Sequence, residues 1–233
     1  MIEWLLTPLS GAPDHTIAPW AAWHGRLMVL SWSFLLPIGM LAARYFKVTP
    51  GQDWPRVLDN KRWWRTHLWV QSAGVAAMTL GLLIAFENAS GAGGAAAIHR
   101  LCGWMAVVIG WVQVAAALLR GHKGGPTEPT LRGDHYDMTP RRIVFERVHK
   151  SLGWIAVPFA LAATALGLAL VDAPRWMPLV LALWWIALIG VGVALQRAGR
   201  CFDTYQAIWG PDPAHPGNKR KPIGWGVSRW SGS

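Results

Sequence analysis

Long apolar runs without charge alternate along the chain with stretches rich in charge, glycine and proline. An α-helix needs about 20 apolar residues to cross a hydrocarbon core about 30 Å thick. The runs are continuous and do not alternate between apolar and polar positions, which favours helices over strands. The uncharged runs are Leu27–Ala43, Thr66–Phe86, Leu101–Leu119, Ser151–Val171 and Trp176–Gln196. They predict five transmembrane helices, over about residues 24–46, 66–87, 98–119, 146–171 and 176–197.

The predicted fold class is therefore an all-α integral membrane protein. Residues 1–23 precede the helices, residues 24–197 form the transmembrane domain, and residues 198–233 form a tail. The composition agrees, since 53% of residues are hydrophobic and only 15% are charged, against about 25% charged in a soluble domain. The 17 tryptophans also agree, because tryptophan is enriched at membrane–water interfaces.

The net charge of +10 would suit a nucleic-acid-binding protein, but the positions of the charges indicate membrane topology instead. If the five helices cross in turn, 19 of the 22 lysines and arginines fall on one side, and only Arg26, Arg100 and Arg175 fall on the other. Positively charged loops stay in the cytoplasm. The sequence thus predicts a bacterial inner-membrane protein with a periplasmic N-terminus and a cytoplasmic C-terminus. We expect membrane lipid among its partners, and we do not expect nucleic acid.

The eight histidines fall into two groups. Four lie in polar stretches and are expected to be solvated: His15, His122, His135 and His215. Ionisable residues within membrane spans are rare and usually mark function. The remaining four each stand near the start of one of the first four predicted helices: His24, His67, His99 and His149.

Helix direction sorts these four histidines into pairs. Because consecutive spans run antiparallel, His24 and His99 share the outer side, whereas His67 and His149 share the inner side. Two imidazoles alone make a poor zinc site, which takes about four ligands. They are suitable axial ligands for a haem iron. The pattern therefore indicates two haem b groups, one for each pair.

Basic and small residues near the histidines fit the same interpretation. Arg26 lies two residues after His24, and Arg100 follows His99, on the side that is otherwise poor in positive charge. Both are predicted to contact haem propionates. Glycines also recur on the helical faces of the histidines, where they would permit close approach to a macrocycle or close helix packing. These glycines are Gly74, Gly81, Gly103, Gly110 and Gly153.

The chain resembles the cytochrome b561 family, the transmembrane dihaem cytochromes that also occur fused to DOMON domains. The matching motifs are "HGRLMVLSWSFLLPIGMLAARYF", "THLWVQSAG", "IHRLCGWMAVVIGWVQVAAALLR" and "FERVHKSLGW", which together cover about residues 23–171. The resemblance implies a haem-binding bundle of four helices and the same two histidine pairs as iron ligands. One difference from the family is the number of helices, because many animal and plant members have six and five are predicted here.

Members of that family often take electrons from ascorbate at a basic cytoplasmic site and reduce monodehydroascorbate or ferric chelates outside. This implies a donor site at Lys61, Arg62 and Arg65, just before His67. No family counterpart is apparent for the tail after residue 197, and it is a candidate surface for a protein partner.

The leading hypothesis is transmembrane electron transfer by a bis-histidine dihaem cytochrome, an electron-transfer oxidoreductase. Single electrons would pass from a cytoplasmic small-molecule reductant or a quinol to a periplasmic acceptor. One alternative keeps the haems in a membrane-anchor subunit that links quinone to a periplasmic redox partner. The other is a non-redox structural subunit of a larger membrane complex, in which the histidines are merely polar.

Overall fold

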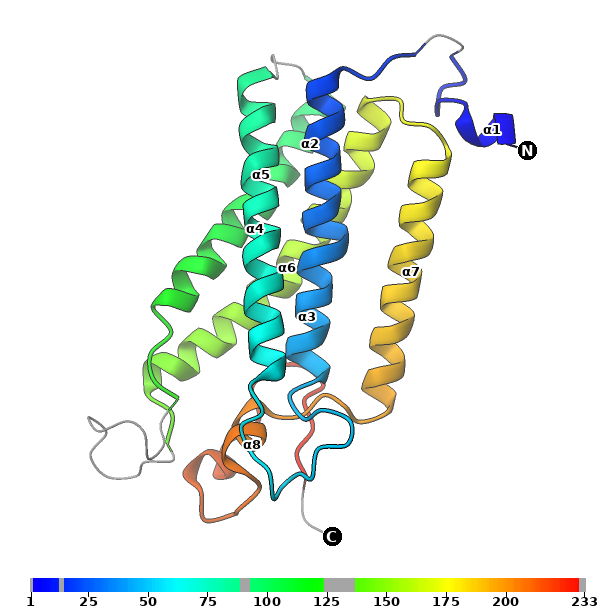
Figure 1. Ribbon diagram of the computed structural model, residues 1–233. Coiled ribbons are helices and arrows are strands. Elements are labelled where there is room, and N and C mark those ends of the chain that lie inside the picture. Colours follow the sequence, from blue (N-terminus) through cyan, green and yellow to red (C-terminus); the bar gives the residue numbers. More distant parts are fainter. Residues whose placement is uncertain (1, 13–14, 89–92, 124–136, 231–233) are drawn as a thin grey trace. The chain divides into compact units, whose positions relative to one another are not determined.

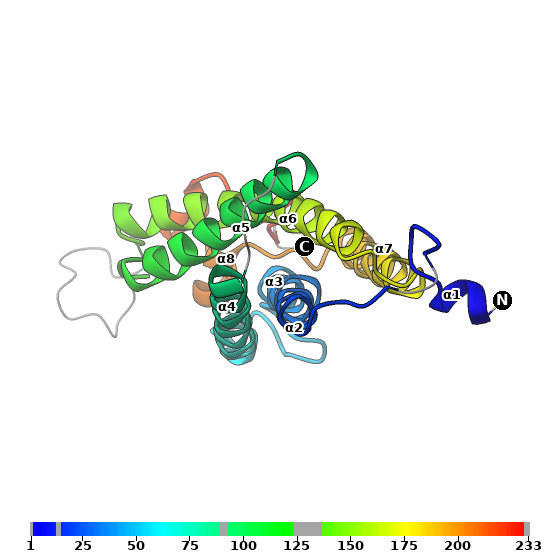
Figure 2. The same ribbon diagram turned by 90° about the horizontal axis from the view of Figure 1, so that it is seen from above.

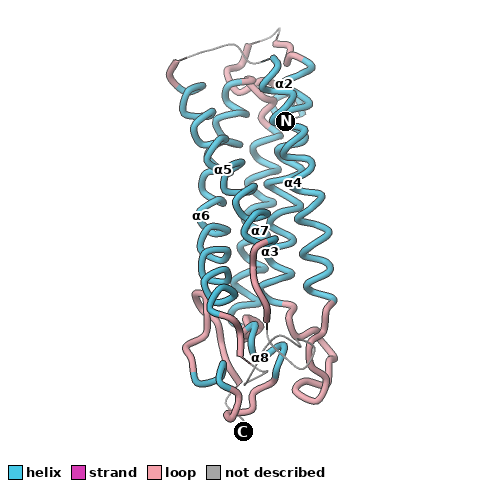
Figure 3. Tube along the Cα trace, turned by 90° about the vertical axis from the view of Figure 1, so that its left-hand side faces the viewer, coloured by secondary structure: helices cyan, strands magenta, loops and turns pink. Residues whose placement is uncertain are grey.

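A computed structural model describes residues 2–12, 15–88, 93–123 and 137–230 of the chain. The described residues form helices and connecting loops without a β-sheet, as the tube in Figure 3 shows. The expected all-α class is therefore confirmed. Part of the connection between the third and fourth predicted helices, residues 124–136, lies outside the described residues.

Five helices within the described residues are long and apolar enough to span a membrane. The first, Pro19–Tyr45, comprises α2 (Pro19–Val29), the π-helix η1 (Leu30–Leu35) and α3 (Leu36–Tyr45). The others, labelled in Figure 1, are α4 (Arg62–Asn88), α5 (Ala95–Leu118), α6 (Pro140–Leu170) and α7 (Trp176–Arg197). The short helices among the described residues are α1 (Ile2–Leu6), α8 (Thr204–Trp209) and the 3-10 helix η2 (Pro216–Lys219).

The helix that carries His149 begins earlier than the apolar pattern predicts, at Pro140 rather than near residue 146. Proline fits the first position of a helix, where no N–H donor is required. In the polar N-terminal part of α6, the Glu146 carboxylate accepts hydrogen bonds from Arg142 at 3.2 Å and from Lys150 at 3.0 Å. Such pairs spaced four residues apart stabilise a helix, so α6 continues beyond its apolar stretch.

The first span contains a wide π-helical turn at Leu30–Leu35. Pro37 follows it and has no N–H, so the carbonyl of Ser33, four residues earlier, lacks its usual helical donor. The indole Nε1–H of Trp184 on α7 donates to this carbonyl at 2.6 Å instead. The carbonyl freed by the proline therefore anchors α7 to the first span.

The chain forms two compact units, which are described separately here. The first unit comprises Met1–Ile38, Trp69–Trp111 and Trp154–Val191. The second unit comprises Gly39–Leu68, Val112–Gly153 and Gly192–Ser233. Each of the five spans contributes one part to each unit.

In the first unit, glycines bring the first span and α4 close together. A Cβ atom on Gly74 would lie 2.7 Å from the side chain of Leu36, and one on Gly81 would lie 3.2 Å from Leu27. Figures 1 and 2 both show α2 directly beside α4. Small residues allow this approach in membrane helices, so these two glycines serve helix packing.

Helix α7 exposes large apolar side chains along its length. The described residues of α7 include no buried residue, and Leu183 and Ile186 are 66% and 65% exposed. A continuous apolar surface of this kind is unusual on a water-soluble protein and suits a helix in contact with lipid. The exposed face agrees with the length and composition of the five helices, and the chain is an integral membrane protein.

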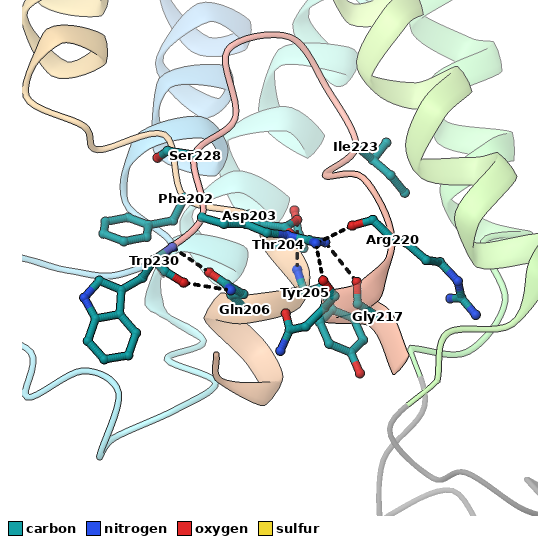
Figure 4. Close-up of polar contacts among 12 residues, drawn as sticks. Phe202, Asp203, Thr204, Tyr205, Gln206, Gly217, Arg220, Ile223, Ser228 and Trp230 are labelled. Atoms are coloured by element: carbon teal, nitrogen blue, oxygen red, sulfur yellow. Dashed lines mark hydrogen bonds and ion pairs between the residues drawn. The ribbon is translucent and has the colours of Figure 1, made fainter. Parts of the chain in front are cut away.

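In the second unit, the described residues after the last span, 198–230, form the polar contacts that Figure 4 shows. Asp203 caps α8 by accepting from the Tyr205 backbone N–H at 3.3 Å. The same carboxylate forms a 2.6 Å ion pair with Arg229, which also donates to the Gly217 carbonyl at 2.9 Å. Gln206 and Trp230 are joined by two further hydrogen bonds. One arginine therefore connects the start of α8, η2 and the end of the described chain.

Candidate functional site

The first unit brings His24 of α2 and His99 of α5 together. Their ring centroids are 6.2 Å apart, and the ring planes make an angle of 80°. His24 Nδ1 donates to the Gly81 carbonyl at 2.8 Å, and His99 Nδ1 donates to the Ala163 carbonyl at 2.9 Å. A carbonyl can only accept, so each Nδ1 carries the proton, and Nε2 keeps a lone pair for a metal.

The second unit brings His67 of α4 and His149 of α6 together in nearly the same way. Their ring centroids are 6.1 Å apart, and their planes make an angle of 82°. His67 Nδ1 donates to the Gly39 carbonyl at 3.0 Å. His149 packs against the Phe145 ring, with centroids 5.0 Å apart. The two pairs suggested by helix direction are therefore the two pairs that the fold assembles.

The spacing of each pair suits one iron between two imidazoles. Two ring nitrogens bonded to one metal at about 2 Å each put their ring centroids roughly 6 Å apart. Across the described part of the chain, no group of three or more His, Cys, Asp and Glu side chains is arranged to hold a metal ion. A haem requires only two protein ligands, because its macrocycle supplies the other four. The donor set therefore fits a haem better than a zinc ion.

A glycine that the sequence pattern did not single out lies beside the first pair. A Cβ atom on Gly167 of α6 would be 3.1 Å from Cε1 and 3.4 Å from Nδ1 of His99. Because Gly167 has no side chain, it leaves the space that the His99 ring occupies. In the sequence, Gly167 is only one more glycine in an apolar run. Its role could not be predicted, because it depends on which face of α6 meets α5.

The five glycines expected on the helical faces of the histidines differ in what surrounds them. Gly74 and Gly81 pack against neighbouring leucines, and a Cβ atom on Gly110 would lie 3.1 Å from Met78. On Gly103, the added atom would meet nothing within 4 Å among the described residues. At Gly153, it would lie 3.4 Å from the amide nitrogen of Gln113. Helix packing therefore explains three of the five glycines.

The two arginines expected beside the outer pair are both exposed. The Arg26 guanidinium lies over the Trp23 ring, 5.0 Å from its centroid. Arg100 directly follows His99 on α5. Both stand in the same unit as their histidines, and their contact with propionates stays a prediction.

The three basic residues of the expected donor site lie around the start of α4. Lys61, Arg62 and Arg65 are all exposed. The Lys61 ammonium is 3.9 Å from the carboxylate of Asp59, which forms a closer ion pair with Lys123 at 2.8 Å. The surface before His67 is therefore strongly basic, and its use by an electron donor stays a prediction.

The contact between the tail and the helix carrying His149 was not predicted from the sequence. Lys150, the residue after this histidine, donates to Glu146, to the Thr204 hydroxyl at 3.3 Å and to the Ile223 carbonyl at 2.8 Å. The ordered tail and α6 are therefore directly connected next to a candidate ligand. The one sequence feature that points to this region is the four-residue spacing of Glu146 and Lys150, which is typical of an ion pair on a helix.

A buried lysine lies between the first span and the tail. Lys47 follows α3, is 5% exposed, and donates to the Phe202 carbonyl at 3.0 Å. Burial, and then the positive charge of Lys150, lower the pKa of Lys47 from 10.5 to about 8. The hydrogen bond from Lys47 to Phe202 connects the tail to the end of the first span.

The fold and the paired rings define the class of this protein. It is an all-α membrane protein whose spans assemble two histidine pairs, each spaced for one metal. Comparison with known proteins gives no matching family model and no matching solved structure.

Curated proteins do match the chain. It is 30% identical over 164 residues to a cytochrome b561, DM13 and DOMON domain-containing protein of Arabidopsis thaliana, covering 70% of this chain and 16% of that protein. It is 34% identical over 101 residues to a cytochrome b561 and DOMON domain-containing protein of the same plant, covering 42% and 23%. It is 28% identical over 148 residues to ferric-chelate reductase 1 of Bos taurus, covering 63% and 22%.

The chain belongs to the cytochrome b561 family, as the motifs suggested. It spans less than a quarter of the length of each of these relatives. The integral membrane location is confirmed. The bacterial inner membrane and the orientation of the termini stay predictions, because these relatives are plant and animal proteins.

Proposed function

We propose that this chain transfers single electrons across a membrane through two b haems. One haem would be held by His24 and His99 in the first unit, and the other by His67 and His149 in the second. The observation that carries the proposal is the spacing of the two pairs, with centroids 6.2 Å and 6.1 Å apart. If the four histidines were unrelated polar residues, nothing would bring them together as two pairs, each at the separation that one metal requires.

The protein supplies the ligands and their orientation. The carbonyls of Gly81, Ala163 and Gly39 each accept from the Nδ1–H of one histidine. Such bonds fix the tautomer and raise the basicity of the ligating nitrogen. Two histidine ligands would leave no iron position for a substrate, so a haem held by such a pair would supply one-electron transfer.

Charges on the chain support assignments for the ends of the electron path. Arg26 and Arg100 would neutralise the propionates of one haem. The basic surface formed by Lys61, Arg62 and Arg65 would attract an anionic small-molecule reductant or the headgroup region near a quinol. The positive-inside rule supports a periplasmic N-terminus and a cytoplasmic C-terminus, so an inside-negative potential would favour outward electron movement.

The acceptor would be a small oxidant on the outer side. The relative named ferric-chelate reductase 1 supports a ferric chelate as one chemical class. This assignment is part of the proposal, because the matched region is a minor part of that relative.

A membrane-anchor subunit is the second candidate function, and one observation favours it. Trp225 in the tail is 79% exposed, as an aromatic residue at a protein interface would be before its partner binds. In this role, the same two haems would link quinone to a periplasmic redox protein, with a further protein partner bound at the tail.

The proposal is tested by a reduced-minus-oxidised visible spectrum of the purified chain together with haem extraction. The expected result is two low-spin b haems per chain. A preparation that binds no haem under conditions where the chain is folded, or a single high-spin haem, would contradict it.

A further inference from the structure

His149 differs from the other three paired histidines in its hydrogen bonding. His24, His67 and His99 each donate from Nδ1 to a main-chain carbonyl. The Nδ1 atom of His149 is buried, and no hydrogen-bond partner for it exists within the part of the chain that the structure describes. Buried polar atoms are rarely left without a partner, so this ring nitrogen requires an explanation.

The side chain of Gln113 on α5 contacts the main chain of His149. Its amide nitrogen donates to the backbone carbonyl of His149 at 2.9 Å. Its amide oxygen Oε1 is also buried and also has no partner among the described residues. Gly153, one turn further along α6, leaves room for this amide, since a Cβ atom there would lie 3.4 Å from the Gln113 nitrogen.

The two unsatisfied atoms are complementary. Nδ1 of a metal-bound histidine carries a proton and is a donor, whereas a carboxamide oxygen only accepts. Both belong to residues already joined by the bond from Gln113 to the His149 carbonyl, and both lie in the second unit. A hydrogen bond between them would satisfy both atoms without a third group.

We propose that Gln113 is the positioning residue for His149. Its amide nitrogen holds the main chain at the ligand, and its amide oxygen accepts from Nδ1–H, as main-chain carbonyls do for the other three histidines. The inference rests on the proposed function, because it assigns Gln113 to one of the two haem sites. No bond is broken, and the proton stays on Nδ1.

The expected effect is on the reduction potential of one haem. An acceptor at Nδ1–H increases electron donation from the imidazole to iron. Stronger donation favours the ferric state and lowers the potential. Gln113→Leu removes the acceptor and should raise the potential of one haem, whereas Gln113→Glu supplies a stronger acceptor and should lower it.

The experiment is a spectroscopic redox titration of the full chain, with electron paramagnetic resonance of the ferric haems. Gln113→Leu is expected to shift one of the two potentials upward, to change one ferric signal and to leave the other unchanged. Gln113→Glu, nearly identical in shape, should shift the same haem in the opposite direction. Gln71→Leu is the matched control, because Gln71 also donates across helices to a carbonyl, that of Leu36 at 3.3 Å.

Three outcomes would overturn the inference: unchanged potentials in both Gln113 variants, equal shifts of both haems, or the same shift in Gln71→Leu. Each leaves the proposed function standing, provided that the wild-type chain binds two low-spin haems. A wild-type chain that binds no haem would overturn the proposed function itself and the inference with it.

Discussion

Single residues decide how each histidine ring is held. Three rings donate from Nδ1 to the carbonyls of Gly81, Gly39 and Ala163, each on another span. The sequence could identify the four histidines, because each opens an apolar run. It could not identify the carbonyls, since these depend on how neighbouring helices are rotated about their axes. The same limit applies to Gly167, whose role beside His99 arises only from packing.

Gly167→Val is expected to displace the His99 ring. Its Cβ atom would lie 3.1 Å from the ring, and its methyl groups would come closer in a tightly packed site. The expected result is loss of one of two haems per chain, measured by haem extraction. Gly190→Val on α7 is the control, because no described atom lies within 4 Å of its added Cβ. Two retained haems in Gly167→Val would contradict the assignment.

Lys47 should give the stability of the second unit a specific pH dependence. The folded chain releases the Lys47 proton near pH 8, whereas the unfolded chain holds it up to about pH 10.5. Between these values the unfolded state binds more protons, so stability rises with pH. Below pH 8 the ammonium is charged in both states, and the cost of burying it is present in full.

Lys47→Met is therefore expected to remove this rise and to stabilise the chain at pH 7 by about 1–3 kcal/mol, because no charge is then buried. The measurement is the thermal unfolding midpoint of each protein at intervals from pH 7 to pH 10. Lys221→Met changes an exposed lysine and should retain the wild-type slope. Parallel curves for wild type and Lys47→Met would show that Lys47 does not titrate as described.

At the scale of elements, apolar length was a good guide to the helices and a poor guide to their ends. The five spans could be predicted because bilayer thickness fixes the length of an apolar helix. The early start of α6 could not, because it depends on the polar residues Arg142, Glu146 and Lys150. The π-helical turn Leu30–Leu35 and the ordered tail also depend on contacts between distant segments.

The tail's order should depend on the Asp203–Arg229 ion pair. The two side chains are 4% and 19% exposed, and removing one partner of a buried pair costs about 3–5 kcal/mol. Arg229→Met is therefore expected to make the residues after 197 more susceptible to limited proteolysis and to lower the unfolding midpoint. Arg56→Met removes an exposed pair with Asp53, and such pairs contribute about 0–1 kcal/mol. Equal protease resistance in both variants would contradict the role of Arg229.

At the scale of the whole molecule, the fold class could be predicted from the continuous apolar runs, and the histidine pairing from the alternating direction of the spans. Histidines at the starts of the first and third spans must share one side, and those of the second and fourth must share the other. The tail's contacts at Lys47 and Lys150 do not follow from span direction. Those contacts connect the tail to helix ends and give it a structural role beside the His67–His149 pair.

The most direct test of the central claim is the number of haems retained by paired histidine variants. If each pair holds one haem, the double variant His24→Ala/His99→Ala should lose the same single haem as either single variant. The cross-pair variant His24→Ala/His67→Ala should lose both. Haem extraction and the low-spin spectrum of the folded chain give the count. One haem retained in the cross-pair variant, or none in the same-pair variant, would contradict the two-pair account.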